Sequence, residues 1–110
     1  MNKIEVNELL DAYGGLLTDK QQEICRYYYR DDLSYQEIAD IMHITRSAVY
    51  DMIKRCRDDL NHYESILKIR SLSREREHLY QKMEALTDNQ EIIQCIRLCR
   101  ETESEGGNYE

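Results

Sequence analysis

The sequence SYQEIADIMHITRSAVYD, residues 34–51, decides the fold of this 110-residue chain because it has the pattern of a helix-turn-helix. A first short helix is predicted to begin after Ser34, a turn to fall at His43-Ile44, and a second helix to begin after Thr45. Two helices cross closely only where a small residue lies at the crossing and apolar residues fill the angle between them. Ala39 is the small residue here. The apolar side chains predicted to fill the angle are Ile38, Ile44, Val49 and Ile53.

The composition extends the helical prediction to the whole chain. There is no proline, and glycine occurs only at positions 14, 15, 106 and 107, so nothing of either type interrupts residues 16–105. That stretch is rich in Leu, Ile, Glu, Arg, Lys and Gln, which favour helices, and it lacks the short β-branched runs that mark strands. The sequence therefore predicts an all-α protein of one domain.

Capping residues and apolar spacing predict where the helices begin and end. Helices are expected over residues 4–13, from residue 18 to about 29, from 46 to about 69, and over 72–86, with a last helix after that. Three capping boxes, each a Ser or Thr followed three residues later by Glu or Gln, are predicted: Thr18–Gln21, Ser34–Glu37 and Thr87–Gln90. The long fourth helix has apolar residues spaced 4, 3, 4, 3 and 4 apart, namely Val49, Ile53, Cys56, Leu60, Tyr63 and Leu67.

The chain divides into three zones along its length. Residues 1–62 hold the helix-turn-helix, residues 63–100 form a C-terminal helical extension of the same domain, and residues 101–110 are an acidic tail that we expect to be disordered. The apolar stripe of the extension must be covered, either because the extension folds back as a hairpin or because it packs against a second copy of the chain. A seam of about two heptads is too short to decide between them, so a homodimer through the C-terminal helices is one of two predictions.

The charge of the chain argues against nucleic-acid binding through overall attraction. The formal net charge is −7, with 15 Lys and Arg against 22 Asp and Glu, whereas proteins held to nucleic acid by charge alone usually carry a basic surplus. Contact with nucleic acid therefore requires a local basic face. The first residues lack the apolar run of a signal peptide, and no stretch approaches the roughly 20 apolar residues of a membrane span. We therefore expect a cytoplasmic protein with reduced thiols and no membrane insertion.

Residues 17–60 resemble the promoter-reading C-terminal domain of bacterial sigma factors. The similarity is carried by LTDKQQEI at residues 17–24, LSYQEIA at 33–39 and ITRSAV at 44–49. It implies a helix-turn-helix bundle of four helices whose last helix reads DNA. The sequence departs from that family at the turn, where His43 replaces the usual glycine, and along the last helix, where Asp51, Asp58 and Asp59 stand in a region that is basic in sigma factors. The turn position favours a positive φ, which histidine adopts at some cost.

A second resemblance covers nearly the whole chain. The segments YGGLLTDKQ at residues 13–21, YYRDDLS at 28–34, RSAVYDMIKR at 46–55 and LNHYE at 60–64 are similar to the YlxM-type family of small bacterial helix-turn-helix proteins. That family is linked to the signal recognition particle pathway, chiefly through neighbouring genes. The resemblance therefore implies a regulatory or accessory role, with components of the signal recognition particle as partners.

The exposed side of the predicted fourth helix supplies the candidate nucleic-acid contacts. In DNA-binding proteins the second helix of a helix-turn-helix enters the major groove, with its first turns against base edges. The candidate nucleic-acid-binding residues on this chain are Arg46, Ser47, Tyr50, Asp51, Lys54, Arg55 and Arg57. We expect Arg46 and Tyr50 to approach bases and Asp51 to be able to accept from cytosine, while the three later basic residues meet phosphates. The alternative is a solvated helix face on a fold that has lost nucleic-acid binding.

Other groups of residues are weaker candidates for a site. The run Tyr27-Tyr28-Tyr29 could stack on unpaired bases, but a helix cannot bury three successive residues on one face, and packing against the helix-turn-helix is the commoner outcome. Cys95 and Cys99 lie one helical turn apart, yet no second pair of Cys or His completes a zinc site. Cys25 and Cys56 are expected in the core. The acid pairs at residues 31–32 and 58–59 lack an accompanying nucleophile or phosphate loop. We expect no catalytic residue, no metal and no cofactor.

Two functional predictions follow from these residues. The first is a non-enzymatic regulatory or accessory helix-turn-helix protein that binds DNA or structured RNA through the fourth helix. The second is a protein-interaction module of the same fold, which contacts a targeting component through its acidic surface without binding nucleic acid.

Overall fold

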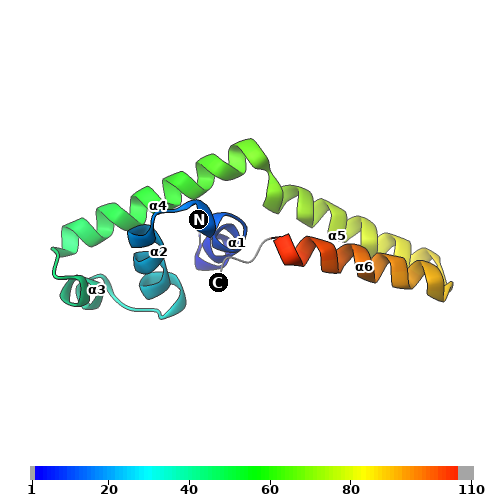
Figure 1. Cartoon of the computed structure of the whole chain (residues 1–110), viewed down its shortest axis with the longest axis horizontal. Coiled ribbons are helices and arrows are strands. Elements are labelled where there is room, and N and C mark those ends of the chain that lie inside the picture. The colour runs from blue at the N-terminus through cyan, green and yellow to red at the C-terminus, as the bar shows by residue number, and fades with distance from the viewer. Residues whose placement is uncertain (1, 107–110) are drawn as a thin grey trace.

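The computed structural model describes residues 2–106, with side chains as far as residue 103, and this part of the chain is all-α, as predicted (Figure 1). In chain order its helices are α1 (Lys3–Tyr13), the short 3₁₀ helix η1 (Gly14–Leu16), α2 (Asp19–Cys25), the π-helical turn η2 (Arg26–Arg30), α3 (Tyr35–Met42), α4 (Arg46–Leu67), α5 (Ile69–Leu86) and α6 (Gln90–Gly106). Helices α3 and α4 form the helix-turn-helix, which confirms the prediction from residues 34–51.

The helices form a head (residues 3–67) and an arm (residues 69–106), as Figure 1 shows. In the head, α1, α2 and α3 each pack against α4, whereas the arm is an antiparallel hairpin of α5 and α6. The molecule measures 58 × 25 × 21 Å, and its radius of gyration is 17.7 Å. A compact domain of this length has a radius of gyration of about 13 Å. The difference arises because the arm extends away from the head.

Predicted caps begin three helices of the head. At α3, the Ser34 hydroxyl accepts from the backbone N–H of Glu37, and the Glu37 carboxylate accepts from the backbone N–H of Ser34, both at 3.1 Å. Thr18 and Gln21 make the same reciprocal pair at α2. The Thr45 hydroxyl accepts a backbone N–H from the first turn of α4 at 3.1 Å. These bonds satisfy N–H groups that have no partner inside the helix, so each helix begins where its cap predicts.

The apolar seam of α4 faces the core of the head. Four of its six residues are buried, namely Val49, Ile53, Cys56 and Leu60. Tyr63 is half-buried and Leu67 is exposed. Because the buried part of the seam packs against α1, α2 and α3 of the same chain, it is not available to form a coiled coil with a second copy.

Cys25 and Cys56 are buried in this core, as predicted. The Cys56 Sγ donates to the carbonyl oxygen of Gln21 at 3.9 Å. A hydrogen bond with Cys56, together with burial, raises the pKa of the Cys25 thiol, so Cys25 stays protonated. Both side chains therefore act as small core residues.

A single residue, Lys68, joins α4 to α5, and a cluster of hydrogen bonds fixes this joint. Lys68 has a φ of 56°, so the chain changes direction sharply between the two helices. The Glu64 carboxylate accepts from the backbone N–H groups of residues 70 and 71 at 3.0 and 3.1 Å, and so caps α5. The Tyr13 hydroxyl donates to Glu64 at 2.5 Å and accepts from the backbone N–H of Ile69 at 2.9 Å. Tyr13 therefore connects α1 of the head to the start of the arm.

Ion pairs also connect the arm to the head. Arg70 and Arg74 of α5 both pair with the carboxylate of Glu8 on α1, the second at 3.1 Å. A hollow of about 400 Å³ lies beside these residues, between α1 and the arm. The arm is thus held by charged groups as well as by the Tyr13 contact.

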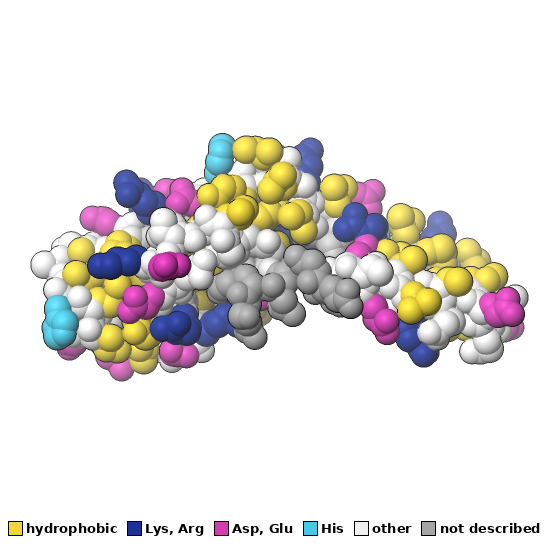
Figure 2. Space-filling view, viewed as in Figure 1, with side chains coloured by type: hydrophobic (Ala, Val, Ile, Leu, Met, Phe, Trp, Pro, Cys, Tyr) yellow, Lys and Arg dark blue, Asp and Glu magenta, His cyan; other side chains and the backbone are white. Residues whose placement is uncertain are grey.

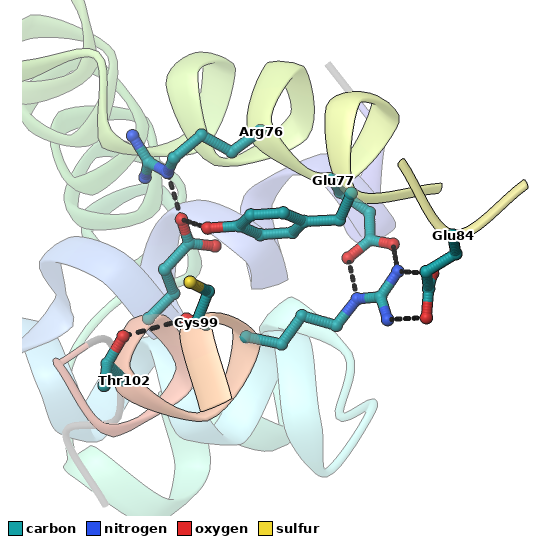
Figure 3. A network of polar contacts seen from close by, with 8 residues as sticks. Arg76, Glu77, Glu84, Cys99 and Thr102 are labelled. Atoms are coloured by element: carbon teal, nitrogen blue, oxygen red, sulfur yellow. Dashed lines mark hydrogen bonds and ion pairs between the residues drawn. The ribbon is translucent and has the colours of Figure 1, made fainter. Parts of the chain in front are cut away.

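An arginine of α6 joins the two helices of the arm through two carboxylates of α5 (Figure 3). The guanidinium of Arg100 donates to Glu77 through Nε at 2.8 Å and Nη2 at 2.9 Å. It donates to Glu84 through Nη1 at 2.8 Å and Nη2 at 2.5 Å. Such bidentate pairs fix geometry as well as charge. The extension therefore folds back as a hairpin, which was one of the two predicted alternatives.

A second polar contact and one apolar residue complete this packing. Arg76 and Tyr80 of α5 both donate to the Glu103 carboxylate of α6, the tyrosine hydroxyl at 2.9 Å. Ile96 of α6 is buried between the helices. Neither arm helix, nor any other helix within residues 2–106, is both long enough and apolar enough to cross a membrane.

Two predictions for the last helix are wrong. Asn89 rather than Thr87 caps α6, because its Oδ1 accepts from the backbone N–H groups of residues 91 and 92 at 2.9 and 3.3 Å. The tail was expected to be disordered from residue 101, but α6 continues to Gly106. Glutamate is a good helix former, and Glu103 is paired across the hairpin, so the acidic residues here prolong the helix. The rest of the predicted tail, residues 107–110, lies outside the described residues.

Candidate nucleic-acid interface

The turn between α3 and α4 exposes the beginning of α4 on the surface of the head. Ala39 is buried at the crossing, as predicted. His43 ends α3 in the left-handed conformation, with φ 56° and ψ 44°, which confirms the positive φ predicted for the turn. The backbone N–H of Ile44 donates to the carbonyl oxygen of Ala39 at 3.1 Å and closes the turn. The apolar residues that fill the angle between the helices are Ile38, Val49 and Ile53, with Ile44 packed against them.

Most of the predicted contact residues lie on the surface of α4. Six of the seven are exposed, namely Arg46, Ser47, Tyr50, Asp51, Lys54 and Arg55. Arg57 is half-buried. The set is therefore accessible along one side of the first three turns of α4, with Arg57 at its edge.

Four of these residues line one shallow hollow. Arg46, Ser47, Tyr50 and Asp51 surround a hollow of about 380 Å³ together with Tyr35 of α3. A second hollow, of about 390 Å³, adjoins it at Asp51 and is lined by Met52 and Arg55 as well. The beginning of the second helix thus offers a concave surface with hydroxyl, carboxylate and guanidinium groups.

Carboxylates lie in the middle of the exposed side of α4. Asp51, Lys54 and Asp58 follow one another at intervals of three and four residues, so they form one line along the helix, opposite the buried seam. Basic residues flank this line on both sides, because Arg46 lines the hollow shared with α3 and Arg55 lines a hollow shared with α2. The surface therefore has mixed charge instead of a continuous basic face.

A series of tyrosine rings leads from the core of the head to the first hollow. Tyr50 meets Tyr35 edge to face, with ring centroids 6.0 Å apart. Tyr35 stacks on Tyr28 at 5.1 Å, and Tyr28 meets Tyr29 at 4.9 Å. Sequence reasoning missed Tyr35. The available signal was its position at the first residue of α3, directly after a cap, which the fold brings against the first turns of α4.

The run Tyr27-Tyr28-Tyr29 lies in the π-helical turn η2. Tyr29 is buried, and the other two rings are half-buried, which agrees with the expectation that one helix face cannot bury all three. Burial raises the pKa of the Tyr29 hydroxyl. One side of the Tyr28 ring stacks on the Tyr35 ring of the helix-turn-helix and therefore does not face solvent. Packing, the commoner of the two predicted outcomes, is therefore what these rings do in the structure.

The remaining candidates lie apart from the two hollows. Lys3 pairs with Asp32 at 2.5 Å and lowers the pKa of that carboxyl. The side-chain amide of Gln21 donates to Asp59 at 2.9 Å. The thiols of Cys95 and Cys99 are exposed on α6. Within residues 2–106, no three or more His, Cys, Asp or Glu side chains gather in an arrangement that could hold a metal ion.

Comparison with known proteins identifies the family of this chain. Residues 1–99 match the family described as "Putative helix-turn-helix protein, YlxM / p13 like". The chain is 47% identical over 68 residues to the UPF0122 protein of Clostridium perfringens (strain SM101), which covers 62% of this chain and 61% of that protein. It is 49% identical over 67 residues to the UPF0122 protein of Clostridium acetobutylicum, covering 61% and 58%.

A relative outside the clostridia is aligned over a longer stretch. The UPF0122 protein of Bacillus licheniformis is 42% identical over 85 residues, which covers 77% of this chain and 79% of that protein. The alignments with the two clostridial proteins span less than two thirds of the length of those proteins. The match to the family, in contrast, includes the whole head and most of the arm.

Proposed function

Because the chain belongs to the YlxM/p13-like family of helix-turn-helix proteins, we propose that it is a non-enzymatic regulatory or accessory protein of the cytoplasm that binds nucleic acid. In this proposal, the first turns of α4 contact DNA or structured RNA. The observation that carries it is the hollow at the exposed start of α4, lined by Tyr35, Arg46, Ser47, Tyr50 and Asp51. The start of the second helix is the part of a helix-turn-helix that meets base edges.

The polar groups around the hollow have distinct proposed roles. Arg46 and Tyr50 contact bases, and the Asp51 carboxylate accepts from the amino group of a cytosine. Lys54 and Arg55 lie farther along α4, where their charges contact phosphates. Arg57, at the edge of this surface, contributes a further phosphate contact.

The charge distribution limits how strong this binding can be. The net charge of −7 repels phosphate, and Asp51 and Asp58 lie on the same side of α4 as the basic residues. Binding therefore depends on a few local contacts. With about three or four phosphates neutralised, the logarithm of the affinity for duplex DNA should fall with the logarithm of the salt concentration with a slope of about −3.

We also propose that the protein acts in the signal recognition particle pathway. This part rests on the resemblance to YlxM-type proteins and not on a residue of the interface. The particle contains a structured RNA, so that RNA is a natural alternative to DNA as the ligand of α4. The homodimer expected from the C-terminal helices concerns the arm and is independent of this interface.

A second candidate function is a protein-interaction module. The observation that favours it is the line of Asp51 and Asp58 along the middle of the exposed side of α4, because carboxylates attract a basic protein surface and repel phosphate. In this alternative, α4 contacts a targeting component and does not bind nucleic acid.

Salt titrations of binding to a duplex DNA and to the RNA of the particle separate the two functions. We expect the double substitution Lys54→Ala with Arg55→Ala to weaken binding by about 10- to 100-fold and to reduce the salt slope by about 2. Lys82→Ala with Arg97→Ala is the matched control, since it removes the same charge from exposed positions on the arm.

The outcomes of these experiments distinguish nucleic-acid binding from the interaction module. Absence of binding at low salt, or an equal effect of both pairs of substitutions, contradicts the proposed interface. Co-purification of a targeting component that persists in the Lys54 and Arg55 variant favours the interaction module.

A further inference from the structure

The arm carries apolar side chains that the described part of the chain leaves substantially exposed. On α5 these are Leu72, Leu79, Met83 and Leu86, and on α6 they are Ile92, Cys95 and Cys99. Leu79 is 53% exposed and Leu86 is 78% exposed. Apolar patches as large as a few hundred Å² on a protein surface are often interaction sites, because their exposure to water is unfavourable. We call these seven residues the arm face.

Helical geometry places all seven residues on one side of the hairpin. At 100° per residue, the α5 members of the arm face lie about a third of a turn from Glu77, Tyr80 and Glu84, which bond to α6. The α6 members lie about a quarter of a turn from Ile96 and Arg100, which face α5. Because the two helices are antiparallel, both rotations lead to the same side. Figure 2 shows hydrophobic side chains over both helices of the arm on the side that faces the viewer.

The seven residues of the arm face are uncharged, and Arg76, one helical turn after Leu72 and one turn before Leu79, is paired with Glu103 of α6. The charged groups between the two helices are already paired within the arm, Arg76 with Glu103 and Arg100 with Glu77 and Glu84. In a twofold dimer each patch contacts its own copy, so a charged patch would bring like charges together. A patch of uncharged side chains, in which the neighbouring charge of Arg76 is neutralised by Glu103 of the same copy, avoids that cost and suits self-association.

We propose that the arm face binds the arm face of a second copy, so that two arms form a four-helix bundle and the protein is a homodimer. The seven side chains expose about 500 Å² of apolar surface in each copy, so their complete burial removes roughly 1,000 Å² from water, which is at the threshold for a specific interface. Amphipathic hairpins pair in this way in four-helix bundles. The inference goes beyond the proposed function and does not depend on it, because the arm face is distant from the start of α4 and needs no nucleic acid.

Measuring the molecular mass of the protein at several concentrations tests whether a second copy binds the arm face. By sedimentation equilibrium of the full chain, we expect twice 13.2 kDa at high concentration and a decrease toward 13.2 kDa on dilution. Leu79→Glu with Met83→Glu places charges in the arm face and should give 13.2 kDa at every concentration. Leu98→Glu is the matched control: Leu98 is 49% exposed but lies two residues from buried Ile96, on the outer side of α6. The Leu98→Glu variant should remain a dimer. Circular dichroism checks that both variants keep their helix content.

The exposed cysteines give a second, independent measurement. Cys95 and Cys99 belong to the arm face, so maleimide labelling of both thiols should slow several-fold as the wild-type concentration rises, and should not slow in the Leu79 and Met83 variant. A mass of 13.2 kDa for the wild type at all concentrations overturns the proposal, as does a dimer that survives Leu79→Glu with Met83→Glu. Monomers that co-sediment with phospholipid vesicles through this face would overturn it in favour of a lipid surface.

Discussion

The head and the arm use amphipathic helices in opposite ways. In the head, the apolar side of α4 faces inward and its charged residues face solvent. In the arm, charged and polar residues of α5 join it to α6, and its apolar residues are exposed. Both helices have the same kind of periodic sequence. Periodicity therefore defines a helix and its two sides, but it does not define which side packs within the chain.

The largest contrast between the two regions should come from removing one apolar side chain in each. Ile53 is buried in the head, so Ile53→Ala should lower the free energy of unfolding by about 2–5 kcal/mol, through lost burial and a cavity. Leu79 is exposed, so Leu79→Ala in dilute protein should change that free energy by less than about 0.5 kcal/mol. Urea unfolding of dilute samples measures both. Equal losses would mean that the arm face is covered within a single chain.

The joint between the two regions should give an intermediate effect. Tyr13→Phe removes the hydroxyl that bridges Glu64 and the backbone N–H of Ile69, and should cost about 1–2 kcal/mol because that N–H loses its partner. The matched control is Tyr63→Phe, which also removes a tyrosine hydroxyl. It keeps the Tyr63 ring, which lies 6.1 Å from the Tyr13 ring. Urea unfolding again gives the free energies. A similar loss in both variants would show that the bridge has no special role in attaching the arm.

Acid should loosen the arm before the core of the head, with the smallest effect of the three. Hydrogen bonds from Arg100 hold the pKa values of Glu77 and Glu84 below their ordinary value of 4.5. Carboxyls whose folded pKa is depressed stabilise the fold fully above the ordinary value, and that stabilisation is lost as the pH falls through the folded pKa. Hydrogen exchange of α5 and α6 amides, corrected for intrinsic rates, should therefore accelerate below pH 4.5 more than exchange in α4.

Arg100→Gln provides the control for this acid effect. It removes the charge that depresses the two carboxyl pKa values, so exchange in its arm should already be faster near neutral pH and should change less on acidification. Arm exchange in the wild type that does not depend on pH across this range would contradict the role assigned to these ion pairs.

Local rules predicted the fold of the head because its signals are local. The hydroxyls of Thr18, Ser34 and Thr45 cap helices within three residues of themselves, and His43 takes the positive φ expected at the turn. The contact residues of α4 remain a prediction, although the structure shows that six of the seven are exposed. The position of Tyr35 directly after the cap of α3 was a signal for its place beside them, but that signal becomes informative only once the crossing of α3 with α4 is known.

The arm was harder to predict because its contacts join residues that are distant in sequence. Arg100 contacts Glu77 and Glu84 only if α5 and α6 pair in one particular register. The sequence offers two possible caps for α6, Thr87 and Asn89. Asn89, which is nearer the helix, is the residue that caps it. The continuation of α6 beyond residue 101 depends partly on the pairing of Glu103 with Arg76, which no local pattern indicates.

A small rotation at the Lys68 joint produces a large displacement at the tip of the arm. Only this residue separates the 22 residues of α4 from the 18 residues of α5. At the usual rise, α5 is about 27 Å long, so a rotation of about 20° at Lys68 displaces the tip of the arm by about 9 Å. One backbone linkage, held by the contact of Tyr13 with Glu64 and by the ion pairs of Glu8 with Arg70 and Arg74, thus sets where the tip lies. In the homodimer that we propose, the same linkage sets the distance between the two copies of α4, and hence the spacing of sites that both could reach at once.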